Sequence, residues 1–217
     1  MTERFVHQLE IEDPGAETPA ETRERLREHF PRGSLRRMTQ LGLLVGRVLE
    51  PMKLQGDEAV VYASAYGESR TLEEYLASFP TPSPTLFQTS IHPSAVQQAL
   101  IARQRGLRQF YPLTGGRLLG SHALQTALQI QASRTVLCGG EERGSWLLGH
   151  GVASEVSFAF AFDLSSDPAR AIARIRLEPG PDAGSALSLP ELFYHLRDRL
   201  ALRRVIAPGL NLALEWL

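Results

Sequence analysis

Residues 107–140, LRQFYPLTGGRLLGSHALQTALQIQASRTVLCGG, decide the fold of this chain. The run at 107–113 indicates a strand, and the following TGG turn leads into a helix predicted at 118–132, whose apolar side chains recur on one face. The run SRTVLCGG at 133–140 is typical of a buried strand. A strand, a glycine turn, a helix and a second strand form a βαβ unit with parallel strands. The sequence therefore predicts an α/β fold.

The segments on either side extend this unit into one layered sheet with helices on both faces. Upstream we expect an edge strand and a polar loop in 1–18, helices at 18–30 and 35–49, a buried strand at 58–64, a helix at 71–79, a proline-rich loop or lid at 79–87 and a helix at 93–105. Downstream we expect two antiparallel strands at 152–164 and 171–177, and a helix at 189–202. We interpret all 217 residues as one domain, with an N-terminal extension (1–33), a core (34–178) and a helical C-terminal appendage (179–217).

The composition is that of an ordinary globular protein. Hydrophobic residues make up 43% and charged residues 22% of the chain, and a net charge of -1 gives no reason to expect a nucleic-acid partner. No stretch approaches the ~20 apolar residues that span a bilayer. The N-terminal stretch lacks the apolar run of a secretory signal. The single cysteine, Cys138, excludes an internal disulfide framework, so we expect a cytoplasmic protein.

Few side chains in this sequence suggest catalysis or metal binding. Cys138 sits at a strand end and is interpreted as a buried structural thiol. Glu141 and Glu142 follow two glycines and are interpreted as acceptors for backbone N–H groups, not as an acid-base pair. The six histidines show no HxH or HExxH spacing, and the glycine pair at 115–116 lacks the Lys-Ser/Thr of a P-loop. We therefore expect neither a metal nor a cofactor.

The order of these segments resembles the N-terminal half of the β-ketoacyl synthases, particularly the short β-ketoacyl-synthase-like family of aryl polyene and related pigment gene clusters. The resemblance covers most of residues 35–177. It rests on five segments: the Arg36-Arg37-Met38 helix, VVYASAYGES at 60–69, PSPTLFQTSIHPSA at 82–95, GSHALQTAL at 120–128 and TVLCGGEE at 135–142. It implies a thiolase-like fold, in which two similar halves stack their sheets.

The resemblance also implies where an active member of the family carries its catalytic groups. Such members place a cysteine at the start of the helix that corresponds to 118–132, where backbone N–H groups receive the acyl oxyanion. Aligning Gly120 with the family's small-residue helix start puts that position near Arg117, and an arginine cannot act as a nucleophile. The catalytic histidines come from the family's C-terminal half, which this sequence does not contain. We therefore expect no independent condensing activity.

The favoured function is a non-catalytic subunit of the chain-length-factor type, which pairs with a full-length ketosynthase and shapes its acyl tunnel in polyketide, aryl polyene or fatty-acid-type biosynthesis. The family dimerises through the strand that precedes the nucleophile helix, so Phe110, Tyr111 and Leu113 are the expected interface residues in a heterodimer or a homodimer. Half of a two-half fold leaves an apolar face uncovered. A partner, self-association or the helix at 189–202 must cover that face.

Two alternatives remain open from the sequence. A small acyl-transfer or hydrolytic enzyme would use Ser121 or Ser90 with His92 or His150. A module that binds an acyl carrier protein needs a basic face, and the candidates are Arg103, Arg105 and Arg108. The residues expected to line a pocket or an acyl tunnel are Phe87, His92, Ser121 and His122.

Overall fold

The computed structural model describes residues 2–180, 186–207 and 209–217, so residues 181–185 of the expected C-terminal appendage lie outside the described residues. In chain order the elements are β1 (Glu3–Glu12), α1 (Pro19–Leu26), η1 (Arg27–His29), α2 (Arg32–Leu35), α3 (Gln40–Leu49), β2 (Ala59–Ala63), α4 (Ser69–Ala77), α5 (Pro84–Thr89), α6 (Ser94–Ala102), β3 (Gln109–Leu113), α7 (Leu119–Gln129), β4 (Arg134–Glu141), η2 (Trp146–His150), β5 (Phe158–Ser165), β6 (Ala173–Pro179), α8 (Leu189–Arg197), β7 (Leu202–Ala207) and β8 (Leu210–Trp216).

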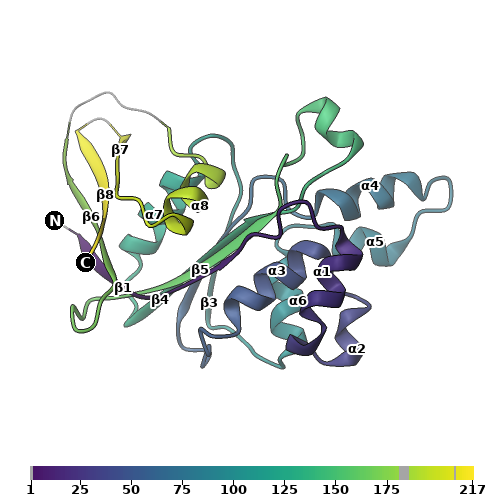
Figure 1. Ribbon diagram of the computed structural model, residues 1–217, viewed down its shortest axis with the longest axis horizontal. Helices are drawn as coiled ribbons and strands as arrows, with labels where there is room; N and C mark the ends of the chain where they lie inside the picture. The colour runs from purple at the N-terminus through teal and green to yellow at the C-terminus, as the bar shows by residue number, and fades with distance from the viewer. Residues whose placement is uncertain (1, 181–185, 208) are drawn as a thin grey trace.

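One eight-stranded mixed sheet organises the molecule, in the order β3-β2-β4-β5-β1-β6-β8-β7. The predicted βαβ unit is confirmed, because β3 and β4, which flank α7, both pair in parallel with β2. The expected antiparallel strands are β5, which pairs with β4, and β6, which pairs with β1 and β8. Figure 1 shows the sheet as a long twisted layer across the molecule.

Helices cover both faces of the sheet, as predicted. Alternate residues of the central strands enter two separate cores, because successive side chains of a strand point to opposite faces. Val60 and Tyr62 pack with α1, α3 and α6 on what we call the α3 face, whereas Val61 and Ala63 pack with α7 and α8 on the α7 face. Figure 1 shows these two groups of helices on opposite sides of the sheet. The α/β fold class is thereby confirmed.

The N-terminal strand lies in a different position from the one expected. β1 was predicted to be an edge strand, but it lies inside the sheet between β5 and β6. Its residues are mostly half-buried, with Val6 buried, and this mixed pattern resembles that of an edge strand. The neighbours of β1 are more than 140 residues away in sequence, so local pattern could not reveal them.

Two helical predictions also need correction. The helix expected at 35–49 begins later, as α3 at Gln40, because Thr39 is its N-cap and the Thr39 side chain accepts the N–H of Gly42. The short α2 lies before it and ends at Leu35. α3 is buried along nearly its whole length. The proline-rich stretch expected as a loop contains α5, in which Pro84 occupies the first turn after the N-cap Ser83.

The C-terminal appendage contains the predicted helix and also strands that the sequence did not predict. α8 occupies 189–197, and it packs against α7 and β5 through buried side chains such as Leu192 and Phe193. The apolar end of the chain then forms β8, which pairs with β6 and β7 and so joins the main sheet. The appendage is therefore a helix and two strands. The division of the chain at 33/34 and 178/179 stays a prediction.

Candidate functional site

The start of α7, where the family resemblance places a nucleophile, is covered by the chain itself. Gly120 lies in the first turn, and a Cβ added to it would come within 2.6 Å of the Ser188 carbonyl oxygen and 2.9 Å of the Leu187 carbonyl oxygen. The backbone N–H of Ser121 donates to the Leu187 carbonyl at 3.3 Å. The segment that leads into α8 therefore lies directly across the first turn of α7.

This contact occupies a backbone donor in the first turn of α7. The first N–H groups of a helix lack partners within the helix, which is why they can bind an oxyanion. The N–H of Ser121 already donates to the Leu187 carbonyl, where α7 contacts the segment that leads into α8. Ser121 itself is fully buried, and its hydroxyl has no hydrogen-bond partner among the described residues. The serine therefore has no route to a substrate.

The contact at Gly120 can be tested by substitution. We expect Gly120→Ala to lower the free energy of unfolding by about 1–3 kcal/mol, because the added methyl would overlap backbone oxygen atoms that can move only with the α8 segment. Gly116→Ala is the control, since Gly116 lies four residues earlier, in the connection before α7, and nothing lies within 4 Å of its added Cβ. Urea unfolding of both variants measures the difference. Equal stabilities would contradict the close packing of the two segments.

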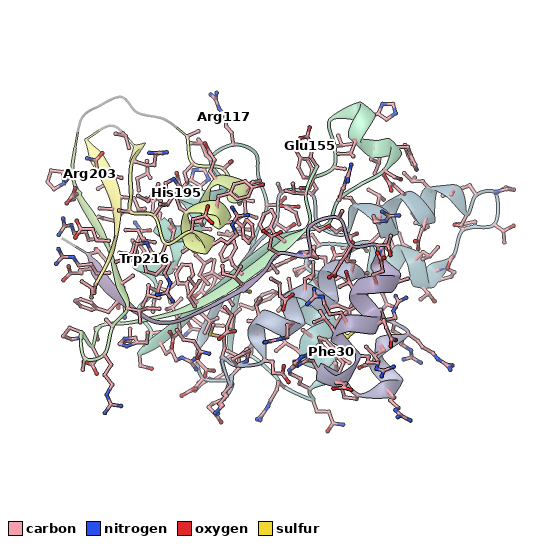
Figure 2. The ribbon with its side chains drawn as sticks, in the orientation of Figure 1. Phe30, Arg117, Glu155, His195, Arg203 and Trp216 are labelled. Atoms are coloured by element: carbon pink, nitrogen blue, oxygen red, sulfur yellow. The ribbon has the colours of Figure 1, made fainter. Side chains whose placement is uncertain are left out.

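Arg117, the expected nucleophile-equivalent position, lies in the exposed turn between β3 and α7. Figure 2 shows its side chain projecting away from the body of the molecule. The guanidinium cannot lose a proton at neutral pH, so this side chain offers no nucleophile. The assignment of this position to the family's cysteine stays a prediction.

β3 forms one end of the sheet and pairs only with β2 among the described strands. Of the three residues expected at an interface, Tyr111 is 37% exposed, whereas Phe110 packs against the core of the α3 face and Leu113 against that of the α7 face. An edge strand with unpaired backbone groups is suited to pairing with another chain. Tyr111 is the side chain of the three that is free to contact a partner.

Two buried glutamates stabilise the turns beyond β2 and β4. Glu141 accepts the Ser64 hydroxyl at 3.1 Å and the backbone N–H groups of Ala65 and Tyr66. Glu142 accepts the N–H groups of Leu41, at 3.2 Å, and of Arg70, at 2.9 Å. Their interpretation as acceptors of backbone N–H groups is confirmed, although the donors come from other segments of the chain.

Burial raises the pKa of both Glu141 and Glu142 to about 7. The backbone hydrogen bonds that each carboxylate accepts oppose this shift, because they favour the charged form. Cys138 is also fully buried, and desolvation holds the pKa of its thiol far above the usual range. The interpretation of Cys138 as a structural thiol is confirmed.

Sequence analysis overlooked Glu68, which is the least satisfied carboxylate in the described part of the chain. It is 1% exposed, and neither of its oxygens accepts a hydrogen bond within the described residues. Desolvation, together with the nearby negative charge of Glu142, raises its pKa to about 8. The only signal in the sequence is an acid in the turn after a buried strand, which is typical of an ordinary exposed loop.

The residues expected to line a pocket are not brought together. His92 stacks on Tyr62 at 5.0 Å between ring centroids, on the α3 face of the sheet, whereas Ser121 lies in the core of the α7 face. Phe87 and His122 are exposed. Ser121 is therefore separated by the sheet from His92. Their role in an acyl tunnel stays a prediction.

Among the described residues, neither serine of the hydrolytic alternative is hydrogen-bonded to a histidine. The Ser90 hydroxyl donates a hydrogen bond to the Phe87 carbonyl at 2.9 Å, at the end of α5. The hydroxyl proton is therefore already used in a local hydrogen bond. His150 lies exposed at the end of η2, edge-on to the Trp146 ring. No specific contact favours a serine-based enzyme.

The three arginines considered for carrier-protein binding lie at and after the end of α6. Arg103 stacks over Phe30, 5.0 Å from the ring centroid, and lies 3.8 Å from the Glu50 carboxylate. Arg105 and Arg108 are exposed in the loop before β3. Their role in carrier-protein binding stays a prediction.

Within residues 2–180, 186–207 and 209–217, no group of three or more His, Cys, Asp or Glu side chains is arranged to hold a metal ion. No helix in the same ranges is long and apolar enough to cross a membrane.

Comparison with known proteins finds similarity only at the level of structure. No family model and no curated protein matches the sequence. Among solved structures, a ketosynthase in complex with its chain length factor from Xenorhabdus doucetiae matches with a TM-score of 0.64 and 16% identity, over 99% of this chain and 99% of the matched chain.

Two further structures match over most of the chain. The ishigamide ketosynthase/chain length factor has a TM-score of 0.59 and 13% identity, over 82% of this chain and 68% of its own. A β-ketoacyl synthase from Burkholderia phymatum has a TM-score of 0.57 and 12% identity, over 84% of this chain and 66% of its own. At these identities the likeness shows the fold. The chain has the thiolase-like fold of the ketosynthases, as the resemblance implied.

Proposed function

We propose that this chain is a non-catalytic, ketosynthase-like subunit that pairs with a full-length β-ketoacyl synthase and helps to shape its acyl tunnel. In this role it is a pseudoenzyme of the chain-length-factor type. The partner supplies the thiol and the histidines, and this chain supplies a second surface against which the growing acyl chain is held. The pathway we propose is of the polyketide, aryl polyene or fatty-acid type.

The observation that carries this proposal is the closed start of α7. A condensing enzyme needs free N–H donors and a nucleophile at this point. Here the Leu187 carbonyl accepts the Ser121 N–H, and Gly120 lies against the backbone of the same segment. A chain whose own backbone covers the start of α7 keeps the fold but does not offer free N–H donors for condensation there. A role in binding fits that arrangement better than a role in catalysis.

The nature of the similar structures supports the same proposal. Two of the three are described as a ketosynthase with a chain length factor. One of them aligns over nearly the whole length of both chains, so a chain of this size occurs in such a pair. Pairing through the outer edge of β3 would use an exposed strand edge and Tyr111, both of which are free in the single chain.

The pairing is tested by co-purifying the tagged chain with each ketosynthase of its own organism and determining the mass of the complex. We expect a one-to-one heterodimer. Tyr111→Glu should weaken it by about 2 kcal/mol or more, roughly 30-fold in the dissociation constant, because a charge would be buried at the centre of the interface.

Tyr194→Glu is the matched control, because Tyr194 is also exposed, at 38% against 37%, but lies on α8. It should leave the heterodimer intact. If no ketosynthase is retained, or if both variants bind equally well, the pairing through β3 is wrong. If the chain instead forms a stable homodimer that Tyr111→Glu dissociates, the interface at β3 is right but the partner is a second copy of this chain.

A further inference from the structure

A small cleft on the outside of the helical layer gathers four arginines. It lies between α1, the connection from α2 to α3, the start of α4, and α5, and its volume is about 160 Å³. Its charged lining residues are Arg23, Arg36, Arg37, Arg70, Glu74 and Glu142. The cleft is on the α3 side of the molecule, and none of its lining residues belongs to β3 or α7.

The arginines of this cleft differ from the arginines that form ion pairs elsewhere in the protein. Ion pairs with carboxylates are formed by Arg25, Arg134, Arg176 and Arg197. None of the four cleft arginines lies within 4.0 Å of a carboxylate oxygen in the described residues. Arg23 donates one N–H to the Met38 carbonyl at 3.3 Å, and its Nε is buried without a partner among the described residues. Unpaired guanidinium groups at close quarters repel one another and favour an anion between them.

The remaining lining groups are suited to an oxyanion. Thr71 and Thr85 add hydroxyl donors to the lining. Of the two acids, Glu74 is exposed, and the Glu142 carboxylate is already held by backbone N–H groups. The four cations therefore outnumber the two carboxylates. The volume is well below the roughly 300–1,000 Å³ of a site for a whole drug-sized ligand, so the cleft fits a single compact group.

We propose that this cleft binds a phosphate group, either as inorganic phosphate or as the phosphate of a small organic ligand. Planar guanidinium groups match phosphate oxygens in pairs, which favours phosphate over a spherical anion such as chloride. The inference is independent of pairing with a ketosynthase, because the site is complete in the single chain.

A depression next to the cleft indicates which kind of organic group would be attached to the phosphate. This depression has a volume of about 430 Å³ and shares Arg37, Met38 and Thr89 with the cleft. Its other lining residues include Gln88, Gln97 and Ser94, whose amides and hydroxyl are uncharged hydrogen-bonding groups. A phosphate monoester with a short polar body would place its phosphate in the cleft and its body here.

The test uses isothermal titration calorimetry on the isolated chain, with inorganic phosphate and glycerol 3-phosphate as separate probes at low salt. We expect saturable binding at one site. Arg36→Gln and Arg70→Gln should each weaken binding by roughly tenfold or more, since each removes charge-assisted hydrogen bonds to the phosphate. Arg36→Lys keeps the charge but loses the planar fork, and should fall between Arg36→Gln and the unmodified protein.

Arg105→Gln is the control, because it removes an equal charge from an exposed position outside the cleft. It should not change the affinity. Arg36 is exposed, so its variants should keep the thermal stability of the parent. Tighter binding of glycerol 3-phosphate than of inorganic phosphate would assign an organic phosphate, and equal binding would assign the free ion.

Three results would overturn the proposal. The first is the absence of saturable binding of either probe at millimolar concentration. The second is an equal loss of affinity in Arg105→Gln, which would mean a general charge effect. The third is binding of poly-glutamate without binding of either phosphate, which would assign the arginines to an acidic protein surface.

Discussion

Replacing Phe193 by alanine is expected to lower the free energy of unfolding by about 3–5 kcal/mol. Phe193 is 2% exposed and stacks on Phe158, with ring centroids 4.4 Å apart. It is the largest side chain that α8 inserts into the core of the α7 face. The lost free energy of unfolding has two parts. The variant lacks the gain from burying an aromatic ring, and a cavity remains between α8 and β5. Urea unfolding followed by circular dichroism measures this loss.

Tyr194→Ala is the matched control, because Tyr194 is the next residue of the same helix and is 38% exposed. Its loss should stay near 1 kcal/mol or below, since little apolar area leaves the interior. Phe193→Ala should also increase the binding of a dye that reports exposed apolar surface, because α8 would no longer hold the α7 face closed. Similar losses in the two variants would mean that α8 is not the cover of that face.

α8 packs over an apolar face of the kind that the sequence predicted to need a cover. Half of a two-half fold leaves an apolar face that must be covered, and the sequence offered a partner, self-association or the C-terminal helix. Leu189, Leu192 and Leu196 join Phe193 in the same core as Leu124 of α7. The chain therefore covers this face itself, and the outer edge of β3 stays unpaired among the described strands.

The central sheet could be predicted from the sequence because its strands and helices carry strong local patterns. The runs that form β2, β3 and β4 are short, apolar and bounded by glycine or polar turns, and α7 repeats its apolar residues at helical spacing. The position of β1 could not be predicted, because it depends on pairing with β5 and β6, far along the chain. The apolar end that forms β8 was too short for its pattern to distinguish strand from helix.

The candidate sites were harder to predict because they are made by contacts between distant segments. Gly120 and Leu187 are 67 residues apart, and nothing in either local sequence indicates that they touch. The arginine cleft draws Arg23 and Arg70 from two helices that are separated by α3 and β2. By contrast, the structural role of Cys138 followed from its place in a buried strand, which is a local property.

Replacing Glu68 by glutamine is expected to stabilise the protein at pH 8, because it removes the contribution of Glu68 to the stability that is lost as the pH rises from about 5 to 8. In the folded protein the pKa of Glu68 is raised to about 8, whereas the unfolded chain releases this proton near the ordinary glutamate pKa of 4.5. Between these values the folded state binds more protons, so its stability falls as the pH rises. Each pKa unit corresponds to about 1.4 kcal/mol, which gives a gain on the order of 4 kcal/mol at pH 8 in the variant.

Glu155→Gln is the control, because Glu155 is exposed on the loop before β5, where Figure 2 shows it at the surface. It should leave the dependence on pH unchanged. The Glu68→Gln variant should still lose some stability with rising pH, because the pKa values of Glu141 and Glu142 are also raised. Urea unfolding at pH 5, 6.5 and 8 measures the three curves. If the unmodified protein gains stability over this range, Glu68 is not held protonated in the folded state, and the buried carboxylate must have found a partner that stabilises its charge.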